Sequence, residues 1–166
     1  MFLKVGAALL LLAADAGGGQ DVDLQLRLER VGELGWRAVM RNAGRGERVF
    51  LLHEGLQPCE LVLEAVGKGP VDRLDWRTVM TMDGTASAKF FKSVPAGGEV
   101  VMAEGTLVKK EGGYGMRWGT FEFRDLAPGR YTATVRFQSV AWHRVDRPKN
   151  IWLGTVSSQP VSFALR

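Results

Sequence analysis

Two histidines and one cysteine are the side chains in this sequence best suited to act as nucleophiles, bases or metal ligands. The run from His53 and Glu54 to Gln57 lacks the second histidine of a His-Glu-x-x-His motif. That motif works because two imidazoles one helical turn apart bind one metal ion. His143 is the remaining histidine, so a site of three histidines is excluded. We therefore expect no metal and no cofactor. A small secreted hydrolase or a metal-dependent enzyme using His53, Glu54, Cys59 or His143 is the alternative.

Cys59 is the only cysteine, so no disulfide can form within the chain. It follows Pro58 and precedes a predicted strand, which favours a small, buried and unreactive side chain. A nucleophilic role would require a histidine and an orienting partner beside it.

Other catalytic patterns are missing from the sequence. There is no Gly-x-Ser-x-Gly and no dinucleotide-binding fingerprint. The glycine-rich run 112–115 lies between predicted strands, where no helix N-terminus is available to bind phosphate. We therefore expect a protein that is not an enzyme.

Length and charge restrict the class of protein further. The chain has 166 residues and a net charge of +4, so one domain is expected. Its cationic residues are scattered, and no basic arm typical of nucleic-acid binding occurs. We expect no nucleic-acid partner.

The N-terminus has the pattern of a secretory signal peptide. A short positive region precedes an apolar run, and Ala14-Asp15-Ala16 provides a cleavage site. A membrane anchor would need about 20 apolar residues, and this run is shorter. The sequence predicts a signal peptide at 1–16, a flexible leader at 17–20 and a folded domain at 21–166. The mature protein would be secreted or periplasmic.

The stretch 119–137 predicts two antiparallel strands joined by a turn. Apolar and polar residues alternate strictly on both sides of the turn, as in half-buried strands. Pro128 and Gly129 are turn residues, and Gly129 is expected to adopt a positive φ. Tyr131 follows them and is predicted to bond through its hydroxyl to the turn backbone, as in a tyrosine corner. A plain turn with a buried aromatic ring is the alternative.

The remaining chain predicts an all-β fold with about nine short strands separated by Gly- and Pro-containing turns. No segment has sustained helical periodicity. The region 71–94 is expected to hold one short strand, a turn and a weaker extended segment. The other predicted strands are at 22–31, 36–41, 48–53, 60–66, 99–109, 151–156 and 161–165.

Several short patterns together resemble small exported bacterial immunoglobulin-like domains. They are the leucines at 24, 26 and 28, the Arg-Asn pair at 41–42, the turn at 125–131 and the run 152–158. The pattern is similar to the non-catalytic N-terminal domain of deuterolysin-type metallopeptidases and to the sandwich of bacterial proteinase inhibitors. The resemblance implies an immunoglobulin-like antiparallel β-sandwich and no particular activity.

Two long segments, 110–118 and 138–150, are predicted to be loops at one end of this sandwich. Both carry aromatic residues beside cations, which are typical of binding hot spots. The predicted partner-binding residues are Tyr114, Arg117, Trp118, Trp142, His143, Arg144 and Arg147. In the alternative, Trp118 and Trp142 fold inward and complete the core.

The sequence thus predicts an exported, non-catalytic module that binds a protein partner. Its most specific form would be an inhibitor of a secreted peptidase. No membrane span is expected, and the oligomeric state is left open.

Overall fold

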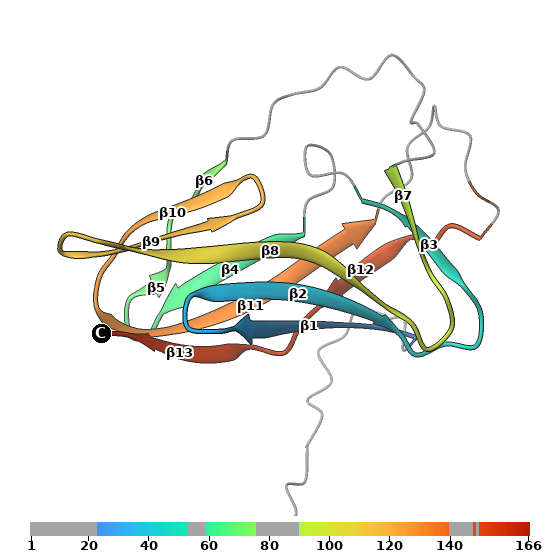
Figure 1. Ribbon diagram of the computed structural model, residues 1–166, viewed down its shortest axis with the longest axis horizontal. Coiled ribbons are helices and arrows are strands. Elements are labelled where there is room, and N and C mark those ends of the chain that lie inside the picture. Colours follow the sequence, from blue (N-terminus) through green and yellow to red (C-terminus); the bar gives the residue numbers. More distant parts are fainter. Residues whose placement is uncertain (1–22, 53–58, 76–89, 140–147, 149) are drawn as a thin grey trace, which may run out of the picture.

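A computed structural model describes residues 23–52, 59–75, 90–139, 148 and 150–166. This part of the chain contains thirteen strands and no α-helix (Figure 1). It also holds no helix long and apolar enough to cross a membrane. The strands are β1 (Leu24–Val31), β2 (Gly35–Asn42), β3 (Arg48–Leu51), β4 (Glu60–Ala65), β5 (Gly69–Pro70), β6 (Leu74–Asp75), β7 (Phe91–Val94), β8 (Glu99–Lys110), β9 (Gly113–Trp118), β10 (Phe121–Leu126), β11 (Gly129–Ser139), β12 (Gly154–Ser157) and β13 (Val161–Leu165).

Two antiparallel sheets pack face to face. The larger has the order β1-β2-β8-β9-β10-β6, and the smaller has the order β12-β11-β4-β5, with β13 also paired to β11. β3 and β7 form a separate two-stranded ribbon. The predicted all-β sandwich is confirmed. The strands outnumber the expected nine because several are pieces of two to four residues.

The core between the sheets follows the alternation of the sequence. In β11 the residues of one parity from Tyr131 to Phe137 are buried, as predicted. Leu24, Leu26 and Leu28 of β1 are buried in the same core. Each buried leucine, valine or phenylalanine of this core contributes about 1.5–3 kcal/mol.

Asn42 joins the larger sheet to the β3–β7 ribbon. Its buried amide nitrogen donates to the carbonyls of Gly46 at 2.7 Å and Val94 at 2.9 Å. Its side-chain oxygen accepts from the amide of Gly44 at 3.0 Å. Because every polar atom of the side chain is bonded, burial of Asn42 is not penalised.

One side of the sandwich, which we call the closed side, is crossed by segment 69–75. This segment pairs with β4 through β5 and with β10 through β6. Between them, the amide of Val71 donates to the carbonyl of Leu63 at 2.9 Å. The Arg73 guanidinium donates to the carbonyl of Leu61 at 3.3 Å and lies 4.4 Å from the ring centre of Phe121. The closed side therefore has hydrogen bonds between the two layers.

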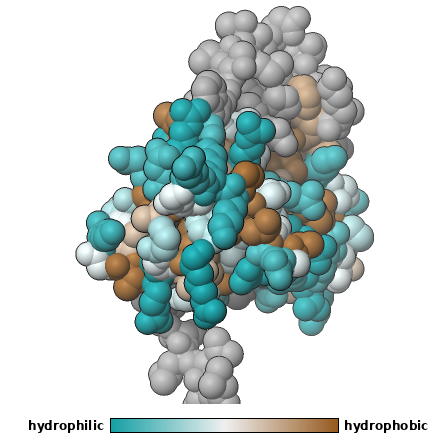
Figure 2. Space-filling model, turned by 60° about the vertical axis from the view of Figure 1, so that its left-hand side comes forward, coloured by the Kyte–Doolittle hydropathy of each residue, from teal (hydrophilic) through white to brown (hydrophobic). Residues whose placement is uncertain are grey.

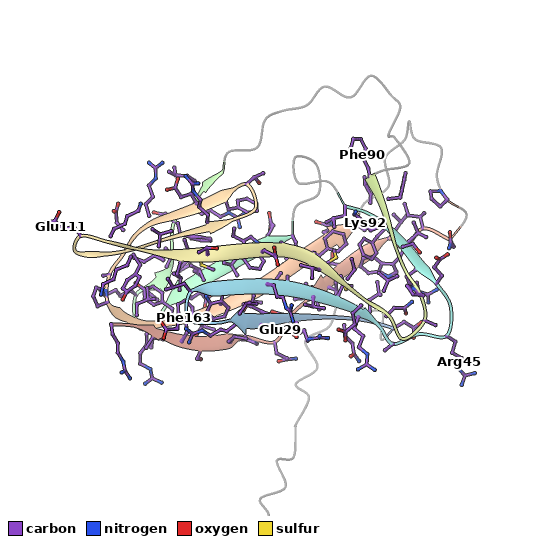
Figure 3. The ribbon with its side chains drawn as sticks, in the orientation of Figure 1. Glu29, Arg45, Phe90, Lys92, Glu111 and Phe163 are labelled. Carbon is purple, nitrogen blue, oxygen red and sulfur yellow. The ribbon has the colours of Figure 1, made fainter. Side chains whose placement is uncertain are left out.

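The opposite side, which we call the open side, ends in β1, β12 and β13 (Figure 1). No backbone hydrogen bond joins β1 to β12 or β13 within the described residues. Here the layers meet through side chains, such as the rings of Trp36 and Phe163 at 5.0 Å. Figure 3 labels Phe163 on this side.

The prediction of a loop at 110–118 is wrong, since Gly113–Trp118 is strand β9. The glycines of this run allow close approach of the backbones. A Cβ at Gly113 would lie 2.8 Å from the carbonyl oxygen of Leu126 on the neighbouring strand. Glycines are common in loops, which is why the sequence predicts one here. In β9, glycine is instead required because the backbone of the neighbouring strand comes close.

Candidate functional site

The outer face of β9 and β10 carries two adjoining hollows. The first has a volume of about 420 Å³ and the second about 310 Å³. Arg117 of β9 and Glu122 of β10 line both hollows and are register partners. Arg124 and Thr120 complete the polar lining of the first hollow. On the face that Figure 2 brings forward, hydrophilic side chains predominate and apolar ones occur in small groups.

A tight turn between β9 and β10 places these side chains on one face. Gly119 has a φ of 52°, and the pair Gly119-Thr120 connects Trp118 to its register partner Phe121. A left-handed residue in a two-residue turn matches the twist of the flanking strands. Since neighbouring side chains alternate, Trp118 and Phe121 point into the core and Arg117 points outward.

The charges around the hollows are mainly positive. Arg124 donates to Glu122 at 3.0 Å, and this hydrogen bond raises the pKa of the Arg124 guanidinium. Arg117 and Lys110 have no ion-pair partner among the described residues. The face thus offers two unpaired cations beside one internal ion pair, an arrangement suited to a carboxylate ligand.

The second hollow depends on a glycine beneath Lys110. A Cβ at Gly115 would lie 3.0 Å from Cε and 3.1 Å from Nζ of Lys110. The glycine therefore lets the lysine side chain lie across β9, close to Arg117.

The hydroxyl of Thr120 is buried at the first hollow and has no hydrogen-bond partner in the described structure. Buried hydroxyls normally have a partner. A ligand with an acceptor or donor near the β9–β10 turn would supply one.

The structure describes three of the seven predicted partner-binding residues. Arg117 is exposed and lines the hollows. Trp118 is completely buried, and its Nε1 donates to the carbonyl of Cys59 at 2.6 Å, so the core interpretation holds for this tryptophan. Tyr114 is half-buried, and its hydroxyl donates to the carbonyl of Arg166. The other four, Trp142, His143, Arg144 and Arg147, lie outside the described residues.

The expectation that the two predicted segments share one end of the sandwich is wrong for Tyr114. Tyr114 lies beside Arg166, next to Leu165, which pairs with Gly129 at the start of β11. Segment 138–150 begins at the other end of β11, about 33 Å away at 3.3 Å per residue. In Figure 3, Glu111 marks the tip of the β8–β9 hairpin, far from the end where β11 finishes in Figure 1. Because 113–118 is a strand, the chain reverses direction once more than predicted. This additional reversal places Tyr114 at the opposite end from the start of segment 138–150.

The tyrosine corner is confirmed. The hydroxyl of Tyr131 donates to the carbonyl of Ala127 at 2.7 Å, and Pro128 lies in the turn between them. The left-handed residue of this turn is Asp125, with a φ of 54°. Gly129 has a φ of 158° and is nearly extended.

Cys59 is buried and unpaired, as predicted. Burial, and to a smaller extent the charge of Glu60, raises the pKa of its thiol. Since the thiolate is the reactive form, this environment disfavours nucleophilic chemistry. His53, Glu54 and His143 of the alternative enzyme lie outside the described residues. Within those residues, no group of three or more His, Cys, Asp or Glu side chains is arranged to hold a metal ion.

Sequence reasoning missed Lys110, Thr120, Glu122 and Arg124 as part of this surface. The alternation Phe121-Glu122-Phe123-Arg124 already indicates that both charged residues share a face. Strand β9 was not predicted from the sequence. Only a strand at 113–118 places Arg117 beside Glu122.

Comparison with known proteins leaves the family open. No protein-family model matches the chain, and a search of curated proteins finds no significant relative.

Proposed function

We propose that this chain is an exported, non-catalytic binding module, and that a protein partner contacts the outer face of β8, β9 and β10. The observation that carries the proposal is the pair of hollows around Arg117, with Lys110 as a second unpaired cation. Arginine at the centre of a partly enclosed surface is a common binding hot spot. An acidic side chain of the partner would complement it.

The exported location rests on the signal-peptide pattern at 1–16. We expect protein recovered from its own host to lack these residues, which intact-mass measurement would check. A mass that still includes Met1 to Ala16 would contradict export by this route.

The binding role can be tested by capture from the culture medium or periplasm of the host. Wild-type protein should retain a stoichiometric partner, and Arg117→Glu should lose it. Arg136→Glu is the matched control, because Arg136 is exposed on β11 of the other sheet. Reversing a central interface charge costs about 2 kcal/mol or more, which is about a thirtyfold loss of affinity. Equal retention by both variants would show that this face is not the binding surface.

Inhibition of a secreted peptidase is the most specific form of the proposal and rests on the resemblance to sandwich inhibitors. In that case the captured partner would be a peptidase, and its turnover would fall to zero near a one-to-one ratio. Full turnover in the saturated complex would limit the role to binding. The predicted residues Trp142, His143, Arg144 and Arg147 remain candidates for additional contacts.

The alternative, a hydrolase or metal-dependent enzyme, gains no support from Cys59. We expect this thiol to resist labelling in the native protein because it is buried. Rapid labelling would favour the alternative again.

A further inference from the structure

The outer edge of β1 is a regular strand edge with no hydrogen-bonded neighbour in the described structure, although β12 of the smaller sheet packs near it. β1 pairs with β2 over all eight residues without a register shift. It contains no proline and no bulge, which are features that commonly protect an edge from pairing.

The free backbone groups of this edge can be identified from the pairing with β2. The amide of Ala43 donates to the carbonyl of Asp23 at 2.6 Å, and hydrogen-bonded pairs recur at every second residue of an antiparallel ladder. The odd-numbered residues of β1 therefore bond toward β2, and the even-numbered ones point their backbone groups outward. These are Leu24, Leu26, Leu28 and Arg30, and none of their backbone groups has another strand as partner within the described residues.

Other edges of the sandwich are shorter or protected. On the closed side, β10 pairs with β6 at two residues and then bulges before Leu126, where Asp125 has a φ of 54°. A bulge with a left-handed residue bends a strand away from a new neighbour. On the open side, β13 has five residues and follows Pro160. β1 is thus the longest regular edge without a partner strand among the described strands.

We infer that β1 pairs with β1 of a second copy of this chain, antiparallel about Leu28, which joins the two larger sheets into one continuous sheet. This twofold arrangement brings the same edge together from both copies. It also uses the outward backbone groups of Leu26, Leu28 and Arg30 as hydrogen-bonded pairs.

The charges of β1 favour this particular register. Centring on Leu28 places Arg27 opposite Glu29 of the second copy, and the twofold axis repeats the pair. Arg27 and Glu29 are odd-numbered, so across this junction they form a non-hydrogen-bonded pair, in which side chains approach most closely. Centring on Arg27 would instead oppose two arginines, and centring on Leu26 would place Gln25 opposite Arg27. A shift by one residue would direct the apolar face of one copy to the solvent.

Ion pairs on the outer face of each copy would lie next to the junction. Arg27 donates to both carboxylate oxygens of Glu99 at 2.8 Å and also to Glu29. Arg37 donates to Glu29 at 2.7 Å. These contacts run from β1 over β2 to β8, so they fix Arg27 and Glu29 on the outer face beside the junction without reaching across it. Figure 3 labels Glu29.

Sedimentation velocity over a range of protein concentrations tests the inference directly. We expect wild-type protein to dimerise, and Arg27→Glu and Glu29→Arg each to weaken the dimer by about tenfold or more, because like charges then face each other in two symmetric pairs. Mixing the two variants should restore the dimer, since the carboxylate introduced at position 27 of one variant then faces the guanidinium introduced at position 29 of the other. Native-like circular dichroism of each variant would confirm its fold.

A backbone variant provides an independent arm. Arg30→Pro removes an amide that points away from β2, which an edge strand tolerates, and should also abolish dimerisation. Arg30→Ala is its matched control, because it removes the same side chain but keeps the amide and the dimer. A wild-type protein that stays monomeric, or a dimer unaffected by the charge variants and their mixture, would overturn the inference. Neither result depends on the Arg117 surface.

Discussion

The closed and open sides of the sandwich join the two sheets through different interactions. On the closed side, segment 69–75 crosses between the layers, and Arg73 and Trp118 donate hydrogen bonds across them. On the open side, the layers meet through packed rings, and the edge of β1 has no partner strand among the described residues. Backbone polar groups that are bonded on one side are thus available on the other. The comparison indicates that stability is concentrated on the closed side and association on the open side.

The largest expected effect concerns two buried tryptophans, one on each side. Nε1 of Trp118 donates to the carbonyl of Cys59, whereas Nε1 of Trp36 has no partner in the described structure. Trp118→Phe should cost about 3 kcal/mol, because it leaves a cavity and an unpaired carbonyl. Trp36→Phe also leaves a cavity but removes an N–H that is unpaired, so it should cost only about 1 kcal/mol. Urea denaturation would measure the free energy of unfolding of both variants. Equal losses would contradict the assignment of greater stability to the closed side.

A second test compares two arginines that lie over aromatic rings. Arg73 also donates to the carbonyl of Leu61 and pairs with Glu60 at 3.2 Å. Arg30 lies 5.5 Å from the ring centre of Trp36, in a more exposed position. We expect Arg73→Ala to lower the free energy of unfolding by about 1–2 kcal/mol, and Arg30→Ala by about 0.5 kcal/mol or less. Thermal denaturation would rank them, and a larger effect of Arg30→Ala would contradict the proposed distribution of stability.

Removal of the tyrosine-corner hydroxyl should have a moderate effect. Tyr131→Phe leaves the carbonyl of Ala127 without this donor and should cost about 1 kcal/mol. Tyr114→Phe is the control, because its hydrogen bond to Arg166 is exposed and water can replace the hydroxyl, whereas the hydrogen bond of Tyr131 is partly buried. Chemical denaturation should therefore show a lower midpoint for the first variant and little change for the second. An unchanged midpoint for Tyr131→Phe would show that the corner adds no stability.

The smallest effect should come from the ion pairs of β1. Hydrogen bonds from Arg27, and then from Arg37, hold the pKa of Glu29 below its usual range. A lowered pKa stabilises the folded protein above the unfolded value of about 4.3, and this contribution is lost as the pH falls through the folded pKa. Glu29→Gln should therefore be slightly destabilising at pH 7, and this effect should shrink as the pH falls below about 4, measured on dilute monomer.

Glu104→Gln is the control for the pH series, since Glu104 forms no ion pair among the described residues. The loss of stability at pH 7 should be smaller for this variant than for Glu29→Gln. A pH-independent effect of Glu29→Gln would mean that the ion pairs of β1 do not stabilise the monomer.

The candidate site could be predicted only in part. The outward direction of Arg117 and the burial of Cys59 could be anticipated from residue type and local pattern. The direction of Trp118 could not, because its hydrogen-bond acceptor, Cys59, is 59 residues away in sequence. The end of the sandwich at which Tyr114 lies depends on whether 113–118 is a strand or a loop. The two glycines of this run are compatible with both, so the sequence did not decide it.

By itself, the sequence determined the faces of the strands. Alternation of apolar and polar residues has a period of two, so local pattern alone places Tyr131 and Phe137 in the core and Arg136 outside. It also determined the turn before Tyr131, because proline and the residues near it restrict the backbone locally. Only the tertiary structure decided the order of the strands. Hydrogen bonding between strands depends on backbone groups that every residue shares, so local pattern does not show that β6 covers β10 while β1 remains at an edge.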